Sequence, residues 1–433
     1  MSLLGALNTA ISGLTAQSKA LGHISDNIAN SQTGGYKRVD TNFVNYLTRS
    51  TATLHMPGSV EARPDYTNSL QGTVQQSDNP LAMAIAGQGF FAVAQPRGSS
   101  NGEVVFDERQ FYARSGDFRL DKDGYLVNGQ GYYLQGWDVS SQGEPDRTQL
   151  SPIRVSDLVY NPVATGTIEL SANLPAEPPV DPVAGQVQIY DSLGRLHQAD
   201  LTWTSLANNQ WSLSIDIADD VNSAGRGTID VSFGNAATTP VADGSIGEFT
   251  NATGSMSGSA AVAGDAAGVT FTADFGEGPQ TLTLNLGAFG QSRGLTQFAG
   301  SEYSVRNLTQ DGVPLGSYSS VSLSDNGDLS VNYDNGQTRV VARVPVVVFN
   351  DPDKLQRLDG QAFMRTVESG EARVVDANSS GAGKLVPGSL ERSNVDIASE
   401  FSKLILAQRA YTANTRVVTA ADELLSDTLN MHR

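Results

Sequence analysis

The chain has 433 residues, a formal net charge of −18 and no cysteine. Its length exceeds one compact core of roughly 150 residues and predicts about two to four domains. The deficit of Lys and Arg weighs against nucleic-acid binding, which takes clustered basic side chains. The lack of cysteine excludes disulfides, thiolate zinc sites and thiol catalysis. We expect no membrane span, because no 18-residue apolar run occurs. We also expect no secretory signal, because no basic n-region precedes it and Gly and Asn interrupt any h-region.

The first 30 residues predict an amphipathic helix. Apolar side chains recur every three or four positions, which is the heptad spacing of helices that pack against one another. The other faces carry small and amide side chains, and Lys19 and Asp26 are the only charges. We expect such a helix to pack on several sides, because it lacks the charged face of a solvated helix. The predicted packing positions are Leu4, Leu7, Ile11, Leu14, Leu21, Ile24 and Ile28.

After this helix the pattern changes to extended structure. Residues 48–72 are polar and contain two prolines, which favours an extended arm or a long loop. Short alternating runs follow over 70–150, split by turn pairs such as Asp123-Gly124, which are strong signals of β-hairpins. The same signals return over 300–350, so both regions are predicted to be β.

Residues 160–290 predict a separate all-β domain inserted into the chain. A proline-rich entry leads to strand-like runs, including 186–190 and 210–217. The acidity is concentrated here, since 15 acidic residues stand against three arginines from Asp157 to Arg293. An exposed middle and buried chain ends would produce this distribution.

The C-terminal residues predict a second heptad helix. Ser393 or Asn394 is its predicted N-cap, with Asp396 in the first turn, where a carboxylate favours the helix dipole. Two such helices at opposite chain ends predict that the termini meet. The alternative is a solitary helix that docks on its own domain. The predicted packing positions are Ile397, Phe401, Leu404, Tyr411, Val418, Leu425 and Leu429.

No group of residues predicts catalysis or a bound cofactor. The four histidines are scattered singly, and nucleophile, nucleotide-binding and metalloprotease motifs are missing. The acidic turns at 121–124 and 325–328 lack the remaining ligands of a calcium loop and predict hairpin turns instead. We therefore expect no catalytic residue, no cofactor and no metal site. Weakly charged terminal helices around β domains favour a subunit of a large homopolymer, whose helices bury against copies of themselves.

Three sequence blocks lie at the chain ends and in the neighbouring β regions. The first comprises residues 27–31 and 35–37, the second 115–127, and the third 388–396 with 407–411. Together they resemble the family of bacterial flagellar rod and hook proteins. The length and the inserted region resemble the hook members more than the shorter distal rod protein. The residues that carry the motif are Asn27, Asn30, Gly35, Tyr36, Ser393, Asn394, Val395, Asp396, Gln408 and Arg409.

The resemblance implies a mainly β fold with α-helical termini that pair as a coiled coil. It implies an inner helical core domain with an extended arm, a middle β domain built from two flanking segments, and an inserted outer β domain. The implied bounds are 1–71 with 388–433 for the inner domain, 72–155 with 291–387 for the middle domain, and 156–290 for the outer domain.

The resemblance further implies an extracellular structural subunit of the flagellum, not an enzyme. Copies would polymerise into a flexible curved tube, the hook, which passes motor torque to the filament as a universal joint. The implied partners are other copies, the distal rod protein, the hook cap protein, the hook–filament junction protein and the flagellar type III export apparatus.

Two alternatives remain open from the sequence. One is a distal rod-type protein that carries an insertion. The other is a secreted adhesin or carbohydrate-binding module, in which Trp203 and Trp211 would contact sugar rather than fill a core.

Overall fold

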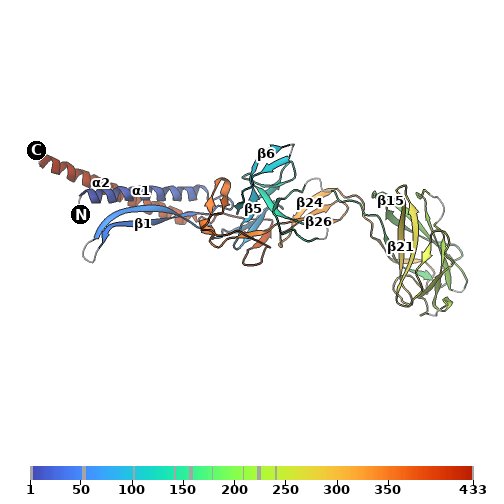
Figure 1. Cartoon of the computed structure of the whole chain (residues 1–433). Helices are drawn as coiled ribbons and strands as arrows, with labels where there is room; N and C mark the ends of the chain where they lie inside the picture. The colour runs from blue at the N-terminus through green and yellow to red at the C-terminus, as the bar shows by residue number, and fades with distance from the viewer. Residues whose placement is uncertain are drawn as a thin grey trace. The chain divides into compact units, whose positions relative to one another are not determined.

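The computed structural model describes residues 3–50, 55–100, 103–140, 143–155, 159–177, 179–207, 209–221, 226–238 and 241–431. The chain divides into two compact units (Figure 1). Unit 1 comprises Met1–Asp157, Ser319–Asn332 and Thr338–Arg433, and unit 2 comprises Leu158–Tyr318 and Tyr333–Gln337. Strands dominate both units, and one α-helix lies at each end of the chain. The predicted mainly β fold with helical termini is therefore confirmed.

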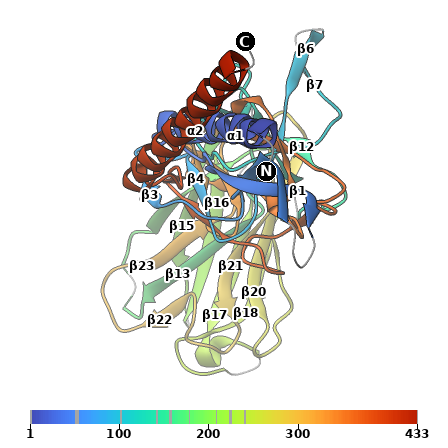
Figure 2. The ribbon, with the colours of Figure 1, turned by 90° about the vertical axis from the view of Figure 1, so that its left-hand side faces the viewer.

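The two α-helices lie side by side and antiparallel in unit 1 (Figures 1 and 2). Helix α1 spans Leu3–Ala29 and helix α2 spans Ile397–Met431. A Cβ atom on Gly13 would lie 2.9 Å from Nδ2 of Asn414, so a glycine here permits close approach of the helices. The buried face of α1 carries mostly small side chains: Ala10, Gly13, Ala16, Ala20, Ile24 and Asn27.

The N-cap of α2 is Asp396, and the prediction of Ser393 or Asn394 is wrong. Oδ1 of Asp396 accepts a hydrogen bond from the backbone N of Ala398 at 3.0 Å. All three side chains suit an N-cap, so local preference could not choose between them. The tertiary contacts of Asn394, described below, engage its side chain elsewhere.

Of the two forms expected for residues 48–72, an extended arm or a long loop, the described residues show extended structure over much of the segment. Strands β1 (Val39–Ser50) and β2 (His55–Tyr66) pair as an antiparallel hairpin. The hairpin lies along α1, where Oγ of Ser12 accepts a hydrogen bond from the backbone N of Val60 at 3.2 Å. The prolines of this segment are tolerated because a two-stranded ribbon leaves one edge of each strand unpaired.

Among the described residues, the largest sheet has eleven strands; apart from the end residues Tyr318 and Tyr333 they belong to unit 1. The sheet joins segments from before and after the insertion. Strand β11 pairs with β26, and β8 pairs with β29. The predicted turn at 121–124 is confirmed, because it connects the paired strands β9 and β10. The strands of this sheet are β5 (Phe91–Ala94), β8 (Phe111–Ala113), β9 (Phe118–Leu120), β10 (Leu126–Asn128), β11 (Tyr133–Asp138), β12 (Ser151–Pro152), β24 (Tyr318–Leu323), β25 (Asp328–Tyr333), β26 (Thr338–Arg343), β28 (Gln356–Arg357) and β29 (Ala362–Met364).

Four two-stranded ribbons complete unit 1. In two of them a strand from residues 74–86 pairs with a strand from residues 384–391, so the segment just before α2 lies against the N-terminal part of unit 1. They are β3 (Val74–Gln76) with β32 (Ser389–Glu391), β4 (Met83–Ala86) with β31 (Lys384–Pro387), β6 (Pro96–Ser100) with β7 (Glu103–Phe106), and β27 (Val346–Val348) with β30 (Arg373–Val375).

Unit 2 contains two sheets whose inner faces supply one continuous apolar core. Trp203 and Trp211 are 0% and 1% exposed within it, so both are core residues. One sheet comprises β14 (Val183–Tyr190), β15 (Leu196–Ser205), β16 (Gln210–Ile217), β17 (Thr228–Phe233) and β18 (Ile246–Thr250). The other comprises β13 (Thr167–Pro175), β19 (Ser257–Gly258), β20 (Ala266–Asp274), β21 (Pro279–Ala288), β22 (Thr296–Phe298) and β23 (Ser304–Gln310).

The boundaries of unit 2 differ from those expected for the outer domain. The sequence places that domain at 156–290, whereas unit 2 continues to Tyr318. The reason is strand β23, which pairs antiparallel with β13 at the start of the unit. The division of the whole chain into three domains stays a prediction.

Candidate subunit interface

Asn27 joins three segments of unit 1 at the end of α1. Its Nδ2 donates to the carbonyl of Val39 at 2.9 Å and to Oε2 of Glu400 at 3.1 Å. Its Oδ1 accepts from the backbone N of Val39 at 2.9 Å and from the hydroxyl of Tyr36 at 3.2 Å. This motif residue thus ties α1 to β1 and to α2.

A buried group of charges lies where the chain ends meet the β region. Nζ of Lys37 lies 2.6 Å from Oε1 of Glu391, and Nε of Arg114 donates to the other carboxylate oxygen. The three side chains are 1%, 1% and 4% exposed for Lys37, Glu391 and Arg114. The group therefore links residues from the N-terminal part, the β region and the segment before α2.

Further hydrogen bonds satisfy this group. Lys37 Nζ donates to the carbonyl of Leu70 at 2.6 Å, and the backbone N of Gly72 donates to Glu391 Oε1 at 2.8 Å. Arg114 Nη2 donates to the carbonyl of Ile85 at 2.7 Å. This partnering makes burial of these ions tolerable.

Burial shifts the pKa of Lys37, which belongs to this charge group, and of its neighbour Tyr36. Burial lowers the pKa of the Lys37 ammonium to about 8, against the attraction of Glu391, which acts in the opposite direction. Burial, reinforced by the nearby Asp26 carboxylate, raises the pKa of the Tyr36 phenol to about 12. The phenol therefore remains a neutral hydrogen-bond donor at neutral pH.

Two further motif residues fix the same junction. Gly35 has a φ of +73°, and a Cβ there would lie 2.7 Å from the backbone N of Ser115, so only glycine fits. Oδ1 of Asn394 accepts from the backbone N of Arg38 at 2.7 Å, and its Nδ2 donates to the carbonyl of Leu70 at 3.1 Å. These contacts hold α2 at a defined place on the N-terminal segment.

The remaining motif residues act locally or stay exposed. Asn30 Nδ2 donates to the carbonyl of Asp26 at 2.9 Å, and Ser393 Oγ accepts from the backbone N of Val395 at 3.3 Å. Gln408 and Arg409 are exposed on α2. The motif therefore combines positions that build the junction with positions that face away from it.

The predicted packing stripes are only partly buried within one chain. Ile24 is buried, whereas Ile11, Ile397, Phe401 and Tyr411 are 47%, 40%, 50% and 41% exposed. The half-buried positions are Leu7, Leu14, Leu21, Ile28, Leu404, Val418 and Leu425. The side chains of Leu4 and Leu429 lie outside the described residues. Apolar side chains on both helices thus stay partly or largely exposed within one chain.

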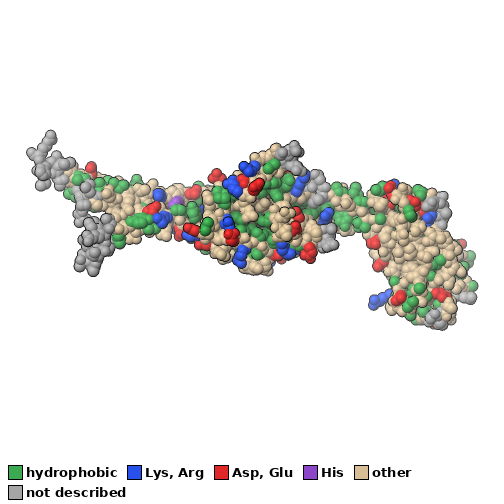
Figure 3. All heavy atoms as spheres, viewed as in Figure 1, with side chains coloured by type: hydrophobic (Ala, Val, Ile, Leu, Met, Phe, Trp, Pro, Cys, Tyr) green, Lys and Arg blue, Asp and Glu red, His purple; other side chains and the backbone are tan. Residues whose placement is uncertain are grey.

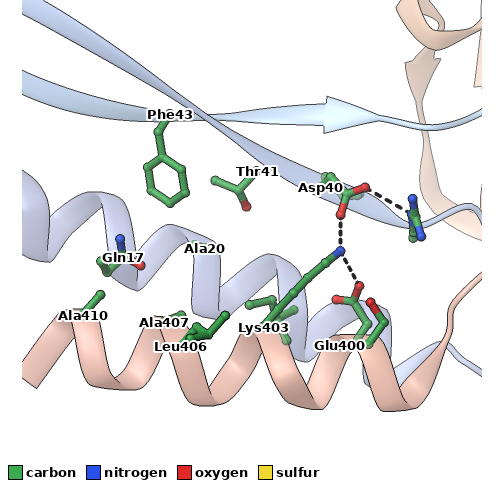
Figure 4. Close-up of a pocket in the computed structure, with 14 residues that line it drawn as sticks. Gln17, Ala20, Asp40, Thr41, Phe43, Glu400, Lys403, Leu406, Ala407 and Ala410 are labelled. Carbon is green, nitrogen blue, oxygen red and sulfur yellow. Dashed lines mark hydrogen bonds and ion pairs between the residues drawn. The ribbon is translucent and has the colours of Figure 1, made fainter.

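A groove of about 650 Å³ opens between the hairpin and the two helices (Figure 4). Phe43 of β1 lies on one side and Leu406 of α2 on another, and they are 44% and 65% exposed. Lys403 crosses beneath them, with Nζ 2.5 Å from Oδ1 of Asp40 and 2.8 Å from Oε1 of Glu400. The groove thus has apolar walls and an internally neutralised floor.

The visible face of the helices carries mainly hydrophobic and uncharged side chains (Figure 3). None of the described helices is apolar enough over a sufficient length to cross a membrane. Among the same described residues, no group of three acidic or histidine side chains is placed to hold a metal ion. The geometry of this region suits contact with another protein surface.

Four family models match successive parts of the chain. They describe a flagellar basal body rod protein (residues 7–37), the D1 domain of flagellar hook protein FlgE/F/G (84–174), the D2 domain of flagellar basal body protein FlaE (173–313) and the C-terminal part of flagellar basal body rod FlgEFG proteins (386–431). The flagellar hook protein FlgE of Brucella abortus is 31% identical over 439 residues, with both chains fully covered. The chain belongs to the flagellar hook protein family.

Other hook proteins match at similar length. FlgE of Rhizobium meliloti is 30% identical with full coverage of both chains, and FlgE of Escherichia coli K12 is 27% identical over 98% of this chain and all of its own. A crystal structure of Helicobacter pylori FlgE2 aligns with 72% of this chain and 98% of its own, at 16% identity and a TM-score of 0.44.

Membership of the hook family makes the chain a structural subunit of the flagellar hook and not an enzyme. It places the chain in the extracellular part of the flagellum. The full-length matches to hook proteins decide against a rod-type protein with an insertion, and the burial of Trp203 and Trp211 removes the sugar-binding role considered for them.

Sequence reasoning missed Glu391, Arg114 and Glu400 as junction residues. Glu391 lies 354 positions from Lys37 and 277 positions from Arg114 along the chain. No local pattern marks an acid and a base so far apart as partners. The only available signal was their position inside or beside the family blocks.

Proposed function

We propose that copies of this chain polymerise through their terminal helices into a curved tube, with the helices packed as an inner coiled-coil layer. The observation that carries this proposal is the row of exposed apolar side chains on α2, including Ile397, Phe401 and Ile405. Apolar surface of this extent on a helix is typical of a protein–protein contact. The predicted packing stripes of both helices would become buried in that contact.

The proposed layout of each subunit follows the three expected domains. Residues 1–71 and 388–433 form the inner domain, 72–155 and 291–387 the middle domain, and 156–290 the outer domain. The acidic composition of the outer segment supports this assignment, because like charges on the outside of a tube oppose sideways aggregation.

The tube acts as a universal joint that passes torque through a bend. Close-packed cores such as that of unit 2 resist compression, so bending must take place between subunits rather than inside them. The remaining partners would be the distal rod protein, the cap and junction proteins of the hook, and the flagellar type III export apparatus.

The test is polymerisation of the purified full-length chain, followed by light scattering and electron microscopy. We expect curved tubes of uniform diameter from the wild-type chain. Phe401→Asp places a charge in the proposed helix contact and should raise the protein concentration needed for assembly by at least about tenfold. The matched control is Val180→Asp, because Val180 of unit 2 is fully exposed.

Circular dichroism should show that both variants stay folded, since neither side chain is buried in the single chain. Wild-type tubes formed by Phe401→Asp at the wild-type concentration would contradict the proposed helix contact. Straight tubes from the wild-type chain would contradict the role as a bent joint.

A further inference from the structure

Helix α2 carries a row of charges on the face turned away from α1. Ala407 and Asn414 face α1, and the row formed by Arg409, Arg416 and Glu423 follows at a spacing of seven residues. Two positions of an α-helix correspond to about 200° of rotation, so this row lies opposite the α1 contact. All three side chains are exposed.

These charges have no ion-pair partner in the described part of the chain. Residues seven positions apart are separated by about 10 Å along the helix, so Arg416 and Glu423 cannot pair well within one helix. The row therefore presents two positive charges and, further along, one negative charge. In a second copy of the same helix shifted along the axis, the negative charge of one copy can lie opposite the two positive charges of the other.

A groove of about 620 Å³ lies between the two arginines. It is lined by Ile405, Gln408, Arg409, Thr412, Ala413 and Arg416. Thr412 and Ala413 are small, so a neighbouring helix can approach the backbone closely at this place. The two guanidinium groups border the groove, which suits a carboxylate that enters it.

We infer that Glu423 of one copy docks between Arg409 and Arg416 of the next copy in the polymer. This inference rests on the proposed function, because a repeated screw operation makes the α2 helices of neighbours run parallel. A carboxylate midway between the arginines corresponds to an axial offset of about 16 Å between neighbouring helices. The pairing fixes this offset, whereas the apolar surface alone would permit sliding.

The test uses charge reversals in the full-length chain under assembly conditions. Arg409→Glu, Arg416→Glu and Glu423→Arg each place like charges together and should raise the critical concentration for tube formation by at least about tenfold. The triple reversal restores opposite charges at every contact, so its critical concentration should return to within about threefold of the wild-type value. Arg119→Glu on β9 is the control for the change in net charge. Arg119 is exposed and does not belong to α2.

The outcomes separate this inference from the proposed function. If the wild-type chain forms no tubes, both fail. If it forms tubes and the single reversals assemble at the wild-type concentration, only the charge pairing fails. Failure of the folded triple variant to recover assembly, or discrete two-copy complexes in place of tubes, would also overturn the pairing.

Discussion

At the scale of single residues, Glu391 links the N-terminal segment and the β region to the segment before α2. It is the common partner of Lys37 and Arg114, and all three side chains are buried. A buried ion pair adds little net stability over apolar packing, but removal of one partner leaves uncompensated charge in the interior. Removal of one partner therefore lowers the free energy of unfolding by much more than the intact pair adds to it.

We expect Glu391→Gln to lower the free energy of unfolding of unit 1 by about 3 kcal/mol or more, because two cations lose their carboxylate. Urea unfolding followed by circular dichroism measures this change. The control is Asp325→Asn, which breaks one exposed pair with Lys384 and should cost less than about 1 kcal/mol. Equal effects of the two substitutions would contradict the role of Glu391.

Local sequence signals could predict turns but not the buried charge group of Lys37, Arg114 and Glu391. The turn at 121–124 was predictable because Asp121 and Gly124 act on their own neighbours: Asp121 Oδ1 accepts from the backbone N of Asp123 at 2.9 Å. The N-cap of α2 was mispredicted because Ser393, Asn394 and Asp396 all suit that position. The charge group depends on pairing over hundreds of residues, which composition and spacing do not reveal.

At the scale of elements, the heptad pattern located both helices correctly. It did not indicate which face each helix buries within its own chain. The buried face of α1 is the one with alanine and glycine, because α2 and the hairpin approach closely there. Apart from Ile24, which is buried, the described larger apolar side chains of the pattern remain half-buried or exposed, which supports their proposed use between copies.

Two glycines of α1 give a matched test of this packing. Gly13→Leu should loosen α1 from α2, because even its Cβ would lie 2.9 Å from Nδ2 of Asn414. Gly22→Leu should strengthen α1 by about 0.8 kcal/mol, because no atom lies within 4 Å of a Cβ there and leucine has the higher helix propensity.

Hydrogen exchange measured by mass spectrometry on the full-length chain reports the result. Protection of the α1 amides should fall in Gly13→Leu and should be kept or increased in Gly22→Leu. Unchanged protection in Gly13→Leu would show that the helices are not closely packed at that point.

At the scale of the whole molecule, the chain contains two compact units with separate apolar cores. The core of unit 2 draws only on residues of that unit, including Trp203 and Trp211. Trp137, the third tryptophan, is buried in unit 1. Intrinsic fluorescence can therefore be assigned to one unit by a single substitution.

We expect two separate unfolding transitions in urea, one for each unit. In a Trp137→Phe background, fluorescence follows unit 2 alone, whereas the helical circular dichroism signal follows unit 1. Glu391→Gln should then shift the circular dichroism transition and leave the fluorescence transition in place. A joint shift of both signals would show that the units unfold together.

The buried charge group also dictates when unit 1 can be completed. Lys37 and Arg114 appear early in the chain, but their carboxylate partner stands at position 391. A growing chain that has not yet reached this position would have to bury two cations without compensation. The junction of Lys37, Arg114 and Glu391 therefore cannot close before position 391 has been added, and a chain that ends earlier leaves the two cations without their carboxylate.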